Sequence, residues 1–490
     1  MFTRVIFRAP PALASPFRLQ VVWAIIRVRN SLLACKIDMA PGCYDEARFV
    51  YTPPSSPKHA LEEAGRALTV HDSNKTGPEL DEDFITGKRK LSAQFLSHMD
   101  VARHKEVSPG IDEFHMALSV LHAITDGTSG HANTILTFLG GSETPGGPLR
   151  TDEDLLKILE MEWTVRWGQR CASFEVITPS AEARLPQPRS RFQAAALKID
   201  SMNVHRRAIG AHAFPRIPSQ FTKQTLLDVK FDRAQTAVLV TKCKSERVTL
   251  QNTVFALCNF AWIRTARNHP EISAPKTLPM LFYTAISLRR HLTPISLLAS
   301  AMSLALGYGN IVLPAFLPSS ADPCAMFWLR ARSVQSQMRK QTQSPLLLAR
   351  SQILSAERAR RAKAFARQDD EADGTLPPSL PRTQQPPAQA PGKSGVPSVA
   401  LMGISHLGDL GATYQMERYP PIEFLDSVGH SRKAKGGILL FTRSAQSCFS
   451  MMLEWDAAAF PPGLVEEFWG YFVSGVHEFI LEESRSQSKL

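Results

Sequence analysis

The chain has 490 residues, 44% of them apolar, so it is long enough for two to four domains and can bury a substantial core. A net charge of +11 would suit an anionic partner such as nucleic acid, but the basic residues are scattered. The one dense basic cluster, at 357–368, holds a single aromatic residue and reads as a solvated helix face, so we expect no nucleic-acid partner. The most apolar N-terminal stretch is interrupted by Arg27 and Arg29, which predicts no membrane span.

The seven cysteines are odd in number, lie far apart and include no Cys-x-x-Cys pair. This pattern argues against a disulfide framework and against zinc, and it indicates a reducing compartment. The first 17 residues are rich in arginine and free of acids, as in an organelle-targeting peptide, but their prolines and the lack of a clear cleavage site weigh against that interpretation. We therefore expect a cytoplasmic monomer with no bound metal or cofactor.

The first half, 1–175, is predicted to be α/β. Its expected elements are a helix at 17–35, a mixed stretch at 44–70, a strand at 113–124, a helix from Thr128 or Ser129 to about 139, and a second helix at 152–169. Residues 176–222 are rich in Pro, Arg and Ser, which is typical of a connection between two halves. No fixed-period repeat is visible.

The second half, 223–490, also alternates strand and helix patterns. We expect strands at 225–231, 278–292, 399–411, 436–446 and 447–456, and helices at 232–246, 248–268, 322–341, 344–367 and 461–483. The interval 366–398 is polar and rich in proline, so it cannot offset its own ordering entropy and is predicted to be a disordered insertion.

A His-x-x-x-Asp-Gly pattern closes the strand predicted at 113–124. Spacing alone leaves two interpretations of His122 evenly weighted: a satisfied histidine before an ordinary Asp126-Gly127 turn, or a catalytic one. A strand followed by a tight turn and a helix would hold the imidazole on a rigid mount, which a general base needs. No Gly-x-Ser-x-Gly nucleophile accompanies it, so the pattern favours direct transfer, in which His122 takes the proton of an attacking hydroxyl.

The segment "LHAITDG" resembles the active-site motif of the CoA-dependent acyltransferase superfamily, which includes chloramphenicol acetyltransferase, plant BAHD acyltransferases and condensation domains of nonribosomal peptide synthetases. Three further segments, at 285–292, 404–411 and 436–456, resemble later parts of the same superfamily in the right order. The closest likeness is to fungal enzymes typified by trichothecene O-acetyltransferases. The resemblance implies two similar α/β halves with a tunnel between them, reached by acyl-CoA from one face and an alcohol acceptor from the other.

Carried onto this sequence, the resemblance makes His122 the general base and Asp126 a structural partner of an arginine, most simply Arg289 and otherwise Arg290. Without the resemblance, both arginines would read as ordinary surface residues. Gly127 would let the turn close without a side chain in the tunnel. Ser405 would donate to the oxyanion, although a turn role is the simpler interpretation of that serine. Residues on predicted helices read as packing or surface groups: His131, Cys258 and Trp262.

Some features depart from the superfamily pattern. Leu121 stands where amide-forming condensation domains have a second histidine, which favours a free-standing enzyme acting on CoA esters. The BAHD Asp-Phe-Gly-Trp-Gly motif is absent, and by the same resemblance we expect the chain to be shortened or differently spliced before the helix at 17–35. The resulting hypothesis is an acyl-CoA-dependent O-acyltransferase, with acetyl as the expected acyl group, acting on a terpenoid or polyketide-like alcohol. The alternatives are a carrier-protein-dependent condensation enzyme and a catalytically silent scaffold.

Overall fold

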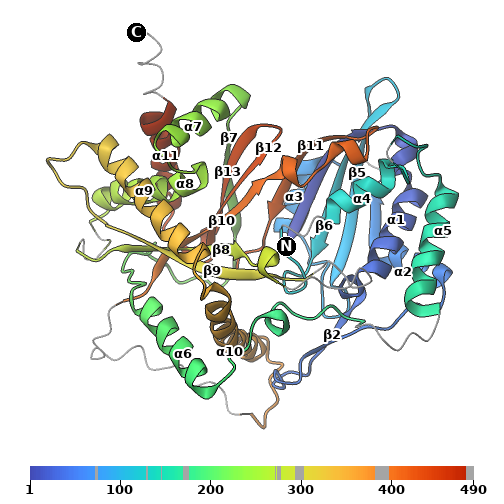
Figure 1. Ribbon diagram of the computed structural model, residues 1–490, viewed down its shortest axis with the longest axis horizontal. Coiled ribbons are helices and arrows are strands. Elements are labelled where there is room, and N and C mark those ends of the chain that lie inside the picture. Colours follow the sequence, from blue (N-terminus) through green and yellow to red (C-terminus); the bar gives the residue numbers. More distant parts are fainter. Residues whose placement is uncertain are drawn as a thin grey trace.

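The structure is a computed structural model of the chain. The described residues are 1–71, 75–127, 131–144, 146–168, 176–270, 272, 277–292, 303–380 and 397–481. They form two α/β lobes side by side, each built on one mixed sheet (Figure 1). No helix in this described part is both long and apolar enough to cross a bilayer.

The sheet of the first lobe has the strand order β11-β1-β6-β5-β4. Its strands are β1 (Phe2–Ala9), β4 (Leu68–His71), β5 (Ser97–Ser108), β6 (Ile111–Val120) and β11 (Glu423–His430). A small separate ladder joins β2 (Lys36–Asp38) to β3 (Arg48–Val50). The basic N-terminal stretch is therefore a core strand: Val5 and Phe7 of β1 are fully buried, and β1 lies antiparallel between β6 and β11.

The α-helices among the described residues of the first lobe are α1 (Pro16–Arg29), α2 (Pro57–Arg66), α3 (Gly77–Ile85), α4 (His131–Gly140) and α5 (Asp152–Trp163). α1 contacts α2, α4 and α5, and its residues 21–26 are all buried, which is why its pattern is apolar on every side. The helix expected to reach residue 35 ends at Arg29, where Asn30 caps it. A strand that the sequence did not predict, β1, precedes α1.

The sheet of the second lobe has the order β7-β13-β12-β10-β8-β9. Its strands are β7 (Gln224–Lys230), β8 (Met280–Ser287), β9 (Leu306–Leu313), β10 (Ala400–Asp409), β12 (Ile438–Ala445) and β13 (Cys448–Asp456). The helices are α7 (Arg233–Ser245), α8 (Leu250–Asn268), α9 (Pro323–Thr342) and α11 (Leu464–Val476). α8 packs against α9 and α11, and Cys258 and Trp262 are buried in that core as packing residues.

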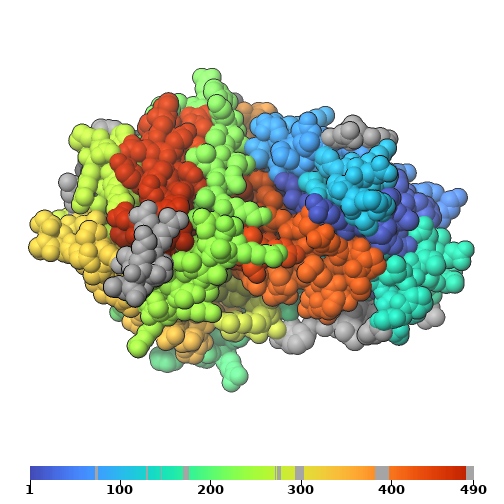
Figure 2. Space-filling view, turned by 90° about the horizontal axis from the view of Figure 1, so that it is seen from above, coloured from blue at the N-terminus to red at the C-terminus, as the bar shows by residue number. Residues whose placement is uncertain are grey.

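One strand of the second half of the sequence belongs to the first sheet. β11 follows β10 along the chain but pairs antiparallel with β1, with Val428 opposite Arg4. Figure 2 shows this orange part of the chain lying against the blue N-terminal residues. The boundary at residue 223 is thus not a boundary in space, because the chain returns to the first lobe before completing the second.

Two segments expected to lack regular structure contain helices. Within the connection 176–222, residues Arg191–Arg206 form α6, which contacts α10 (Leu347–Asp373). α10 also includes residues 366–373, the first part of the predicted insertion. Their polar side chains can stabilise the helix through ion pairs at helical spacing, such as Arg367 with Glu371. Residues 381–396 of that insertion lie outside the described part.

Candidate active site

The turn after β6 carries the His-x-x-x-Asp-Gly pattern. β6 ends at Val120, earlier than expected, and the Ile124 N–H donates to the Leu121 carbonyl, which closes a tight turn. Within this turn Thr125 and Asp126 are buried, whereas His122 is exposed. The buried flank anchors the turn and leaves the imidazole accessible.

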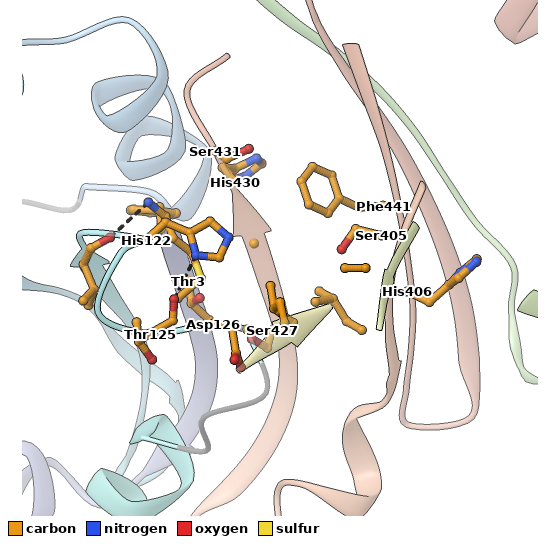
Figure 3. Close-up of a pocket in the computed structure, with 18 of the residues that line it drawn as sticks. Thr3, His122, Thr125, Asp126, Ser405, His406, Ser427, His430, Ser431 and Phe441 are labelled. Atoms are coloured by element: carbon orange, nitrogen blue, oxygen red, sulfur yellow. Dashed lines mark hydrogen bonds between the residues drawn. The ribbon is translucent and has the colours of Figure 1, made fainter. Parts of the chain in front are cut away.

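The orientation of the His122 ring fixes its tautomer. Its Nδ1 lies 2.8 Å from the backbone oxygen of Thr125 (Figure 3). A carbonyl oxygen only accepts hydrogen bonds, so Nδ1 must carry the hydrogen and donate it. The neutral ring therefore keeps its lone pair on Nε2, which is the atom a general base uses.

Asp126 joins the two lobes. Its carboxylate accepts from Arg289, at 2.9 Å from the guanidinium Nη2, and from the backbone N–H of Ala305, at 3.1 Å. The same Nη2 also donates to the Ser303 carbonyl at 2.6 Å. Arg290 instead lies against His291. Because Asp126 is only 2% exposed and already accepts two hydrogen bonds, it can hold the turn in place more readily than it can exchange protons.

A cavity of about 330 Å³ lies between the lobes and reaches His122. The first lobe supplies His122, Thr125, Asp126, Gly127 and His131 to its wall, and the second sheet faces them with side chains that include Tyr283, Tyr308, Ser405 and Phe441. No Lys or Arg is among its described lining residues. The cavity therefore suits a largely uncharged molecule placed between the histidine and the second sheet.

Ser405 lies on β10, where it pairs with Phe441 of β12, so the turn interpretation of this serine is wrong. Figure 3 shows its hydroxyl on the cavity side of the strand, across from His122, whereas the ring of His406 points the other way. His406 packs on Phe255 and bonds Thr442, and burial lowers its pKa to about 4. Alternation along the strand thus gives the cavity a hydroxyl and the core a neutral imidazole.

Two other predicted residues line the same cavity. A Cβ added at Gly127 would lie 2.9 Å from the Leu407 side chain, so the glycine permits a close approach between the lobes. His131, expected to be a packing or surface group, is half-buried at the start of α4 and lies 3.4 Å from the Thr125 hydroxyl. Burial, followed by the charge of Arg289, lowers the pKa of His131 to about 4, so this ring is neutral near pH 7.

Comparison with models of known protein families gives no match, and no curated protein sequence matches the chain. Solved structures do match it. A trichothecene 15-O-acetyltransferase from Fusarium sporotrichioides gives a TM-score of 0.66 at 12% identity, covering 98% of this chain and 90% of that one. The condensation domain of the monacolin K polyketide synthase gives 0.54 at 11% identity, covering 98% and 91%. Polyketide synthase associated protein 5 from Mycobacterium tuberculosis gives 0.53 at 14% identity, covering 96% and 92%.

The chain shares the fold of these solved structures, which include an acetyltransferase and a condensation domain. The two-lobed α/β architecture expected from the sequence is thereby confirmed. In this two-lobed fold the turn that carries His122 lies where the two sheets face each other across the cavity.

The structure also contains a buried ionic cluster that the sequence did not predict. His430 of β11 lies 2.7 Å from Glu454 and 3.5 Å from Asp81, and Lys433 contacts the same glutamate. His430 also lines the cavity. These residues come from α3, β11, the segment after β11, and β13, so no sequence spacing predicts their proximity. Burial alone would lower the pKa of His430, but its hydrogen bonds and charge contacts with Asp81 and Glu454 outweigh burial and raise it.

We expect His430→Gln to destabilise the protein in a pH-dependent manner. A raised folded-state pKa means that the protonated His430 contributes stability fully below the unfolded value of about 6.5, and that this contribution is lost as pH rises through the folded value. The difference in Tm between the original protein and the variant should therefore be larger at about pH 6 than at about pH 9. Thermal unfolding followed by circular dichroism at both pH values tests this, and an equal difference would contradict it.

Proposed function

We propose that the protein is an acyl-CoA-dependent O-acyltransferase that moves an acyl group, acetyl as the first candidate, to a hydroxyl of a secondary metabolite such as a terpenoid or polyketide. The observation that carries this proposal is the His122 ring, with Nδ1 held by the Thr125 carbonyl and Nε2 available in a cavity between the lobes. The full-length structural likeness to a trichothecene acetyltransferase supports the same reaction class.

In the proposed reaction, Nε2 of His122 takes the proton of the acceptor hydroxyl as its oxygen attacks the thioester carbonyl. The new C–O bond converts that carbonyl to a tetrahedral oxyanion, to which the Ser405 hydroxyl can donate. Collapse breaks the C–S bond, and the leaving thiolate takes the proton from the His122 imidazolium. The histidine returns to its starting state, and no covalent enzyme intermediate forms.

The cavity chemistry favours an alcohol over an ammonium-bearing acceptor. Among the described lining residues, Asp126 is the one carboxylate, and its charge is already paired with Arg289 through Oδ2, which also accepts from the Ala305 N–H. A buried ammonium group would find no available counter-charge there, which is costly. Leu121 in place of a second histidine points in the same direction.

The test is thiol release from acetyl-CoA by the purified protein, measured with and without a panel of hydroxylated terpenoids and polyketides and matched amines. The proposal expects release that depends on an alcohol, together with an ester product of the added acyl mass. Amide products only would indicate a condensation enzyme. A folded protein that binds CoA but releases no thiol with any acceptor would instead support the silent-scaffold alternative.

Ser405→Ala is expected to lower kcat about 10- to 100-fold with little change in KM, because it removes a donor to charge that develops only in the transition state. Stability should change little, since no hydrogen bond of the Ser405 hydroxyl is described in the structure. Ser405→Thr keeps the hydroxyl and should retain more activity than the alanine variant. Steady-state kinetics of both variants would contradict the role if they were equally active.

A further inference from the structure

A second cavity, of about 620 Å³, also reaches His122. It shares Met1, Phe2, His122 and Ser431 with the cavity between the lobes, so the two meet beside the histidine. Much of its remaining apolar wall comes from the first lobe: Ile37, Met39, Leu80, Phe84, Leu91 and Leu121. A two-substrate reaction at His122 therefore has two separate places in which to hold its substrates.

The two cavities differ sharply in charge. The second one is lined by Lys88, Arg89 and Lys90, which follow α3, and by Arg432, which follows β11. The first has no Lys or Arg among its described lining residues. Electrostatics alone would direct an anionic substrate into the second cavity and leave the first for an uncharged one.

The acidic residues of the second cavity do not cancel this charge. Asp83 pairs with Lys75, which is outside the lining, and the buried Asp100 pairs with Lys90 and His71. The ion pairs of the described residues include none for Lys88 or Arg89, and both side chains are exposed. Two cations thus remain available to a ligand.

Arg432 anchors the backbone that leads directly into these two cations. Its guanidinium donates to the carbonyls of Phe84 and Gly87, each at 2.6 Å, and its carbon lies 5.5 Å from the centroid of the Phe84 ring. These contacts join the end of α3 to the segment after β11. One of the two acceptors, Gly87, immediately precedes Lys88 in the chain. Burial lowers the pKa of Arg432, and the nearby charge of Arg89 lowers it further. We call Lys88, Arg89 and Arg432, which line this cavity together, the rim cations.

We propose that the phosphate-bearing acyl thioester enters through this second cavity, with Lys88 and Arg89 recognising its phosphates and Arg432 positioning them, while the uncharged acceptor occupies the cavity between the lobes. This assignment rests on the proposed function. The apolar wall suits the uncharged arm that joins the phosphates to the thioester, and a bound anion relieves the repulsion among the rim cations.

The test is isothermal titration calorimetry with three probes: CoA, 4′-phosphopantetheine and pantetheine. The double variant Lys88→Ala/Arg89→Ala is compared with the original protein and with Lys198→Ala/Lys244→Ala, which removes the same charge from exposed positions on α6 and α7. We expect the rim variant to bind CoA about tenfold or more weakly and to lose most of its salt dependence, with pantetheine affinity unchanged. If the affinities for CoA and for 4′-phosphopantetheine both fall, Lys88 and Arg89 contact the phosphate next to the pantetheine arm, which both probes carry.

If the Lys88→Ala/Arg89→Ala variant binds CoA as tightly as the original protein does, the assignment of the acyl thioester to the second cavity is wrong. It is also wrong if the affinity for pantetheine falls as much as that for CoA, because pantetheine carries no phosphate. The proposed function fails separately: if the original protein neither binds CoA nor releases thiol from acetyl-CoA with any acceptor, both proposals fall. If transfer depends on His122 but the rim variant retains the CoA KM of the control, only the assignment of the cavity falls.

Discussion

Replacement of His122 by alanine is expected to reduce acyl transfer about 10³-fold while leaving the fold intact. The side chain lies on a turn whose buried flank, Thr125 and Asp126, does not depend on the imidazole for packing. Its one described hydrogen bond, from Nδ1 to the Thr125 carbonyl, orients the ring and contributes little to global stability. The loss should therefore appear in kcat, measured as acceptor-dependent thiol release from acetyl-CoA.

Two comparisons make that result specific. His205→Ala removes an exposed histidine from α6 and should leave turnover and Tm unchanged. The affinity of His122→Ala for CoA should also remain near that of the original protein, because the proposed phosphate contacts lie elsewhere. Near-original turnover in His122→Ala would contradict the general-base mechanism.

Asp126→Asn is expected to lower both activity and stability. Its carboxylate is 2% exposed and ties the His122 turn to Arg289 and Ala305 of the other lobe. Removing the charge turns a charge-assisted hydrogen bond of a largely buried pair into a neutral one, which we expect to cost about 2 kcal/mol of unfolding free energy. Because the turn would then be less well fixed, kcat should fall about tenfold or more with a smaller change in KM.

A double-mutant cycle with Arg289→Gln separates this pair from a general loss of packing. If the two side chains act through each other, the double variant should be little less stable than either single variant. Asp200→Asn breaks a bidentate ion pair with Arg350 that lies between α6 and α10, and it should leave kcat unchanged. Additive losses in the cycle would contradict the proposed coupling.

Local patterns in the sequence were sufficient where neighbours along the chain determine the structure. The alternating run at 113–124 predicted β6, and the Asp-Gly pair predicted the turn that presents His122. The helical spacing near 250–268 predicted α8, and the apolar pair near 436–456 predicted the β12 and β13 hairpin. Each of these elements satisfies its own hydrogen bonds or pairs with the adjacent segment, so its signal is contained in a short window.

Elements that depend on distant partners were missed. β1 was not predicted as a strand, because the acids that neutralise its arginines are distant in the sequence: Arg4 pairs with Asp81 and Arg8 with Glu113. β11 lacks a clear periodic pattern, and its place in the first sheet depends on pairing with β1, more than 400 residues away. Sequence spacing does not encode such register.

The sequence by itself determined the two-lobed α/β class and the residues of the His122 turn, because strand alternation, turn chemistry and the family-like motif are all local. Only the tertiary structure decided that Arg289 rather than Arg290 meets Asp126, that Ser405 faces the cavity from a strand, and that Lys88 and Arg89 gather beside Arg432 at a second cavity. The reason is physical: a cavity and its charge are made by side chains that the sheets bring together from distant segments, and their proximity exists only once the backbone has closed around them.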